Sequence, residues 1–202
     1  MTNDAERFQR AIALIDEANS RDPNSDLLEG QSVPRELLYS DRLTAWVLKL
    51  EPGASEALRL AARSQHICRW KIPRAEYPPG KAGYHQWKND LKRFHADMTV
   101  GILKKAGYEE STVERVRALN LKQGFPVDPE TRILEDALCL VFLEFQFADL
   151  AAKADSEKVV NALQKSWNKM TERARAIALT LPFGPPEQAL LDRALGRSQG
   201  IA

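Results

Sequence analysis

The sequence is poor in the residues that build cross-links, histidine-rich metal sites and membrane spans. Its two cysteines, Cys68 and Cys139, lie outside any CxxC pair, so we expect buried free thiols rather than a disulfide. It has only three histidines, so any metal site must also use carboxylates or amides. No apolar run approaches the roughly 18–20 residues that a transmembrane helix needs. These shortages exclude a disulfide-stapled scaffold and an integral membrane protein.

The sequence also lacks a dominant charge. It carries 29 basic and 28 acidic residues, which gives a formal net charge of +1. This balance offers no general attraction to nucleic acid or to an anionic membrane. The polar start MTNDAERFQR has no hydrophobic core of a signal peptide. We therefore expect a cytoplasmic protein that partners neither membranes nor nucleic acid, and the sequence leaves its oligomeric state open.

Apolar residues recur at helical spacing along almost the whole chain, and no convincing alternating strand appears. The pattern predicts a single compact all-α domain over 1–202 with about seven to eight helices. The polar segment RDPNSDLLEGQS is predicted as a loop. The expected helices cover 3–20, 34–50, 54–70, 84–106, 110–122, 130–152 and 155–180, followed by a short helix that ends at 195.

Three blocks, in chain order, resemble helices of the HD superfamily of metal-dependent phosphohydrolases. They are LRLAARSQHICR, HADMTVGILKKAGY and DPETRILEDALCLVFL. In the first block, Gln65 and His66 stand where the superfamily has its adjacent His and Asp ligands. Asp136, in the third block, stands at the final aspartate position. The resemblance implies an HD-like core over about 34–152, with helix 3–20 and the helices of 155–196 packed on it.

The same resemblance implies a polar pocket and assigns roles to its side chains. A divalent metal of unknown identity would be held by His66, His95 and Asp136. His66 and Asp136 would also serve catalysis, with Glu56 as a base or an orienting group. The ligand would be bound by Arg42, Gln65, Arg69 and Arg74. These roles imply binding of a small phosphorylated or nucleotide-like molecule, and hydrolysis of a phosphoester if the metal is retained.

Two departures from the HD pattern favour an alternative. The segment YSDRL lacks the early histidine of the superfamily, although Asp41 and Arg42 stand there. Gln65 carries an amide, which is a poorer ligand for a transition metal than imidazole or carboxylate. The alternative is a catalytically inactive, HD-derived binding or scaffold protein, in which Gln65, His66 and Arg69 form a buried polar network. Whether the protein is an enzyme therefore stays open.

Longer strings of the chain are similar to a family of bacterial and fungal proteins known as domain of unknown function 4202. The similarity spans nearly the full length, and the family brings no activity with it. The strings that carry it are ELLYSDRLTAW, ASEALRLAARSQHICRWKIPR, GYHQWK, LEDALCLVFLE and KSWNKM.

Overall fold

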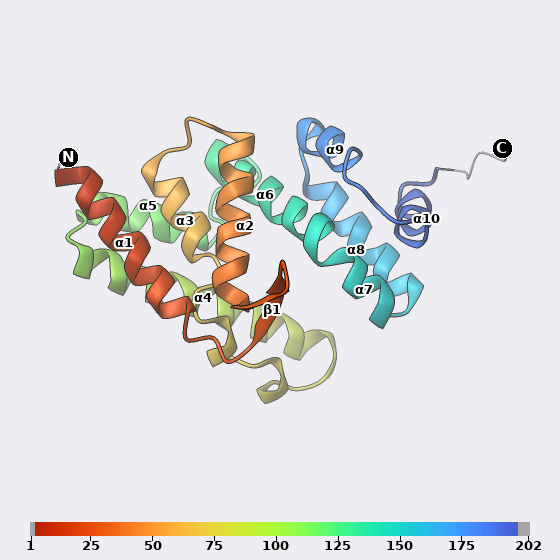
Figure 1. Ribbon diagram of the computed structural model, residues 1–202, viewed down its shortest axis with the longest axis horizontal. Coiled ribbons are helices and arrows are strands. Elements are labelled where there is room, and N and C mark those ends of the chain that lie inside the picture. Colours follow the sequence, from red (N-terminus) through yellow and green to blue (C-terminus); the bar gives the residue numbers. More distant parts are fainter. Residues whose placement is uncertain (1–2, 198–202) are drawn as a thin grey trace. The chain divides into compact units, whose positions relative to one another are not determined.

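The structure is a computed structural model that describes residues 3–197, and it is mostly helical (Figure 1). Helices make up 72% and strands 4% of it, so the all-α prediction is confirmed at that level. The predicted number of helices is wrong, because the described residues form ten α-helices, two short 3-10 helices and a small hairpin. The chain divides into two compact units, Met1–Thr131 and Arg132–Ala202. The expected single domain stays a prediction.

The first unit is built on helices that surround α3. Contacts join α3 to α1, α2, α4 and α5. Helix α3 is short but strongly amphipathic, and it buries Leu58, Leu60, Ala61 and Ala62. The elements are α1 (Asn3–Asn19), β1 (Ser25–Leu28), β2 (Gln31–Pro34), α2 (Arg35–Leu50), α3 (Glu56–Ser64), η1 (Arg69–Lys71), η2 (Arg74–Glu76), α4 (Gly80–Ala106), α5 (Glu110–Asn120) and the start of α6 (Pro129–Phe145).

A hairpin replaces the loop predicted over RDPNSDLLEGQS. Strands β1 and β2 pair antiparallel, with Ser25 opposite Pro34 and Leu28 opposite Gln31. The turn residues Glu29 and Gly30 both have positive φ, 51° and 82°, which is the geometry of a two-residue hairpin turn. These strands are short and largely exposed, so they carry no apolar alternation that the sequence could reveal.

Helix α3 ends earlier than the predicted 54–70. Its last residue is Ser64, and the chain then turns so that Cys68 adopts a left-handed φ of 51°. The backbone N–H of Cys68 donates to Oδ1 of Asn19, at 3.0 Å, instead of continuing a helical ladder. Gln65 and His66 therefore lie on a turn at the C-terminal end of α3.

The second unit contains the rest of α6, then α7 (Phe147–Lys153), α8 (Ser156–Lys169), α9 (Glu172–Ala178) and α10 (Pro185–Ala194). The predicted helix 130–152 is interrupted at Gln146, and the predicted helix 155–180 is interrupted before Thr171, which caps α9. Leu140, Phe147, Leu163 and Leu191 are among its fully buried residues.

The structure bears on the state of the two cysteines and on membrane-spanning helices. Cys68 and Cys139 are both free and buried, as predicted. Within residues 3–197, no helix combines the length and the apolar character needed to cross a membrane.

Candidate functional site

Three aromatic rings, from α2, from the turn after α3 and from α4, stack beside the end of α3. Tyr39 of α2 lies 4.0 Å from His66, measured between ring centroids, and the two planes differ by 9°. On its other side His66 faces His95 of α4, at 5.8 Å and 28°. The early end of α3 places His66 between these two rings. Two of the three predicted metal ligands are therefore neighbours.

A buried carboxylate meets this stack from the first turn of α2. Glu36 is 6% exposed, and its Oε2 lies 3.5 Å from Nδ1 of His66. Its Oε1 lies 3.9 Å from Nε of Arg69. Burial raises the pKa of Glu36 to about 7, with Asp22 adding to the rise and Arg69 opposing it. Glu36 can therefore change protonation state near neutral pH.

His95 is held in one tautomer by the backbone. Its Nδ1 lies 2.7 Å from the carbonyl oxygen of Ile67. A carbonyl oxygen can only accept, so Nδ1 carries the proton and Nε2 is left as an acceptor. Burial, followed by the neighbouring His66, lowers the pKa of His95 to about 3. Burial and the charges of Arg69 and Lys122 also lower the pKa of His66 well below 6.5, so both imidazoles are neutral at pH 7.

A polar network continues behind His95 toward α5. The side-chain amide of Asn120 donates to the hydroxyls of Ser64 and Thr99, each at 3.1 Å. Thr99 in turn donates to the backbone carbonyl of His95, at 2.7 Å. The Nε2 of Gln65 donates to the backbone carbonyl of Asn120, at 3.5 Å. Gln65 is thus tied to the network that positions His95, rather than aimed at solvent.

Four buried atoms of this region have no hydrogen-bond partner among residues 3–197. They are Oε2 of Glu36, Oε1 of Gln65, Nε2 of His95 and Oδ1 of Asn120. The donor nitrogens of Gln65, His95 and Asn120 already point at acceptors, so lone pairs remain on these three side chains and on the carboxyl of Glu36. Buried polar atoms are almost always satisfied in native proteins. An ordered water, a cation or a ligand with donor groups would satisfy these atoms.

The cationic side of the cluster is Arg69, at the start of η1. Its side chain is 33% exposed, and its Cζ lies 5.0 Å from the ring centroid of Trp87. Trp87 is itself fixed, because its Nε1 donates to the backbone carbonyl of Ile72 at 2.9 Å. A guanidinium that is stacked, loosely paired and partly exposed can still accept an anionic group. We refer to Glu36, His66, Arg69 and His95 as the His66 cluster.

Two other residues expected in the site, Arg74 and Glu56, are engaged elsewhere in the first unit. Arg74 donates to the backbone carbonyls of Tyr77 and Pro78, both at 2.9 Å, and so fastens the connector before α4. Arg42 is half-buried on α2. Glu56 lies at the opposite end of α3 from Gln65, roughly 14 Å along the helix axis. There it accepts a hydrogen bond from the hydroxyl of Tyr108, at 2.5 Å.

Asp136 belongs to the second unit and is engaged there. The backbone N–H of Thr171 donates to Oδ1 of Asp136 at 2.8 Å, and the Thr171 hydroxyl donates to Oδ2 at 2.6 Å. Thr171 is the N-terminal cap of α9, so Asp136 fastens that helix to α6. The neighbouring Glu135 lies 3.4 Å from Nζ of Lys169. A role for Asp136 as a metal ligand or catalytic residue stays a prediction.

The described residues do not supply a complete metal site. His95 has the arrangement of a metal-ligating histidine, since its N–H is bound by a carbonyl and its other nitrogen is available. However, no three His, Cys, Asp or Glu side chains within residues 3–197 converge in a way that could hold an ion. Binding of a divalent metal therefore stays a prediction, with the free nitrogen of His95 as the one feature of the described residues that favours it.

Glu36 is the residue that the sequence analysis missed. The HD resemblance places an early histidine in YSDRL, and Asp41 of that segment pairs with Arg63. A signal for Glu36 was present, because Glu36, Leu43, Val47 and Leu50 follow the helical spacing of the buried face of α2. A carboxylate on that face must either be paired or serve a ligand.

Sequence comparison assigns the chain to a family. Residues 9–191 match the family described as Domain of unknown function (DUF4202). The match covers most of the chain, so the protein belongs to this family, as its long strings indicated. No curated protein and no solved structure matches the chain. The likeness to the HD superfamily rests on the three sequence blocks alone.

Proposed function

We propose that this protein binds a small phosphorylated or nucleotide-like molecule at the His66 cluster. The observation that carries the proposal is the pair of buried acceptors, Oε2 of Glu36 and Nε2 of His95, which have no hydrogen-bond partner among the described residues. They flank His66, whose ring stacks on His95, and the partly exposed Arg69 lies beside Glu36. Acceptors next to a cation suit a ligand that has donors at one end and an anion at the other.

A nucleotide-like molecule has this combination of groups. Its phosphate accepts the N–H groups of a guanidinium, which Arg69 presents. Its base carries N–H donors, which can satisfy Glu36 and His95. Planar groups also stack favourably on aromatic rings. The order of the three HD-like blocks supports the same class of ligand, because the superfamily it resembles acts on phosphoesters.

A thermal-shift panel tests the proposal. The probes are ATP, GTP, AMP, GMP and pyrophosphate, each with and without Mn²⁺. A ligand at a concentration 100 times its dissociation constant stabilises the folded protein by about 2.7 kcal/mol, which moves the unfolding midpoint measurably. We expect at least one probe to raise the midpoint of the wild-type protein.

Matched variants localise the effect. Arg69→Gln removes the anion-binding group and should abolish the shift, whereas Arg93→Gln, on an exposed side chain of α4, should leave it intact. If every probe leaves the wild-type midpoint unchanged, or if both variants respond equally, the proposed ligand class is wrong.

The second candidate function is a metal-dependent phosphohydrolase. The specific observation in its favour is the fixed tautomer of His95, with Nε2 available. Metal analysis of the purified protein, with hydrolysis of p-nitrophenyl phosphate in the presence of Mn²⁺, tests it. If the purified protein neither contains nor binds a divalent ion, the hydrolase candidate is wrong. The proposal of ligand binding at the His66 cluster does not depend on that result.

The alternative is a catalytically inactive, HD-derived binding or scaffold protein. The network of Ser64, Gln65, Thr99 and Asn120 supports it, because these side chains bond to one another and to the backbone. In this case the cluster serves to position α3, α4 and α5. The scaffold predicts that no probe of the panel stabilises the protein, so the same experiment separates the two candidates.

A further inference from the structure

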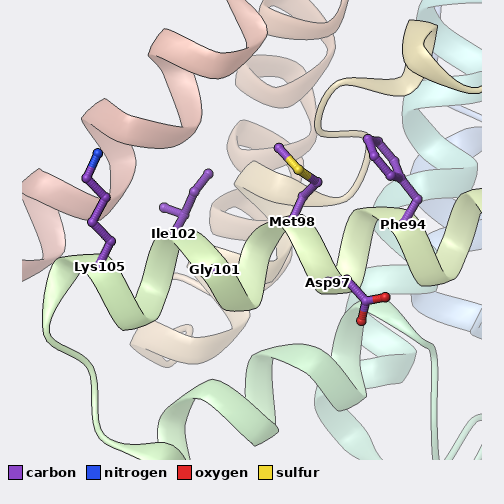
Figure 2. Close-up of a pocket in the computed structure, with 6 residues that line it drawn as sticks. All are labelled: Phe94, Asp97, Met98, Gly101, Ile102 and Lys105. Carbon is purple, nitrogen blue, oxygen red and sulfur yellow. The ribbon is translucent and has the colours of Figure 1, made fainter.

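Helix α4 presents an open, mostly apolar groove that the proposed function does not use. Its volume is about 440 Å³, and it is lined by Phe94, Asp97, Met98, Gly101, Ile102 and Lys105, all on α4. Figure 2 shows Phe94, Met98, Ile102 and Lys105 projecting to one side of the helix, while Asp97 points to its lower edge. The groove is therefore a helix face with a hollow in its middle.

The hollow lies at Gly101. A Cβ atom added at this position would meet no atom within 4 Å, so the space above the backbone is open. Phe94, Met98, Gly101 and Lys105 follow one another at intervals of four, three and four residues. This spacing is that of the seam along which two helices pack in a coiled coil. Gly101 leaves a gap in the seam because it has no side chain. Met98, three residues earlier, has a long side chain that can fill such a gap in a facing helix.

The charges of the face are also complementary. Asp97 is 69% exposed and lies 4.0 Å from Nε of Arg117, while Lys105 is exposed at the far end of the seam. When two copies of this helix run antiparallel, residues whose numbers have the same sum lie opposite each other. The register that sets Met98 of one copy over Gly101 of the other also sets Lys105 opposite Phe94, within one turn of Asp97.

We propose that the face lined by these residues is an isologous dimer interface, in which α4 packs antiparallel against α4 of a second copy of this chain. Each Met98 fills the hollow at the partner's Gly101. Each Lys105 lies over the ring of the partner's Phe94, where a cation–π contact forms, and within reach of the partner's Asp97. A two-fold axis through the seam makes every contact twice, as an isologous interface requires.

A second copy fits this face better than an unrelated partner because Met98, the gap at Gly101 and both charges lie on the same short helical segment. A self-complementary surface is the signature of two-fold pairing. This inference does not rest on the proposed ligand. The groove residues and the His66 cluster share no side chain, although the ring of Phe94 lies 5.8 Å from that of His95, measured between ring centroids.

Sedimentation velocity of the full chain tests the proposal. The wild-type protein is expected to form a species of twice 22.7 kDa as its concentration rises. Gly101→Leu fills the hollow without a clash inside the chain, and it should leave a folded monomer with an unchanged circular dichroism spectrum. Lys165→Glu, an exposed charge change in the second unit, is the matched control and should dimerise like the wild type.

Charge reversal makes the test specific for the register. Lys105→Glu should raise the dimer dissociation constant by about tenfold or more. Adding Asp97→Lys in the same chain exchanges the two charges and should restore much of the affinity. A wild-type protein that stays monomeric at every concentration overturns the proposal. So does a dimer that survives both Gly101→Leu and Lys105→Glu.

Discussion

At the scale of single residues, Glu36 sets the character of the site. Its carboxyl is almost fully enclosed, and its nearest cation, Arg69, lies at 3.9 Å, too far for a strong charge-assisted hydrogen bond. An ionised carboxylate in such a place weakens the fold. A buried carboxyl with a raised pKa and only long contacts to His66 and Arg69 is typical of a functional site.

The cost of burying Glu36 gives a pH-dependent prediction. Its pKa is 4.5 in the unfolded reference and about 7 in the folded protein, so the folded chain binds this proton more tightly. The stabilising contribution of Glu36 is therefore complete below pH 4.5 and is lost as the pH rises through 7. The loss is on the order of 3 kcal/mol, from 1.36 kcal/mol per pKa unit. The Glu36→Gln variant has no ionisable group at this position, so it should not show this loss of stability.

Urea denaturation of both proteins over this pH range measures the difference. His66 and His95 contribute the opposite pH dependence. Their pKa values are lower in the folded protein, so their contribution to stability is lost as the pH falls below 6.5. They are present in both proteins, so the difference in unfolding free energy isolates Glu36. We expect the variant to gain on the wild type as the pH rises. A difference that is the same at every pH would show that Glu36 is not titrating as described.

The sequence was sufficient to predict some residues of the His66 cluster but not all of them. It singled out His66, Arg69 and His95, and the structure places these three side chains together. It missed Glu36 because an acidic residue in the first turn of a helix is ordinarily explained by the helix dipole. It grouped Glu56 with His66, although the length of α3 separates them. Helical spacing reports which face a residue occupies, but not which end of a helix meets a neighbour.

At the scale of elements, α4 contains two internal glycines with opposite surroundings. A Cβ added at Gly83 would lie 2.0 Å from the carbonyl oxygen of Pro78, so the connector packs directly on the glycine. At Gly101 the same atom would meet open space. Gly83 is thus required for close packing, whereas Gly101 weakens the helix without serving the folded monomer.

Alanine substitution at the two glycines should therefore have opposite signs. Gly83→Ala overpacks the contact with Pro78 and should destabilise the protein by about 1–3 kcal/mol. Gly101→Ala should stabilise it by up to about 1 kcal/mol, because alanine is the better helix former. Chemical denaturation at low protein concentration measures both. Equal effects of the two substitutions would contradict the close approach of Pro78 to α4.

Element boundaries were predictable where the signal is local. Helix α4 ends at Ala106 as predicted, because Gly107 takes a left-handed φ of 89° as a helix-terminating glycine does. The end of α3 was not predictable, because it depends on Asn19, which accepts from Cys68 across 49 positions of sequence. A hydrogen bond of this kind leaves no trace in a helical periodicity.

At the scale of the whole molecule, the sequence predicted the helical class and the family, while the expected single domain stays a prediction. The two compact units meet within α6, at Thr131 and Arg132, where the helical pattern runs on without a break. A unit boundary inside a helix has no proline, glycine or polar linker to mark it. Asp136 and His66 consequently lie in different units, although the resemblance to the HD superfamily implied that they belong to one core.

The most direct test of the account is histidine-selective ¹⁵N NMR of the wild-type protein during titration with ATP, GTP and pyrophosphate. The chain has three histidines, so His85, which is exposed on α4, serves as an internal reference. We expect the imidazole signals of His66 and His95 to move on addition of a bound probe while those of His85 stay in place. Signals of His66 and His95 that no probe moves, or that move no more than those of His85, would contradict the proposal that the His66 cluster binds a ligand.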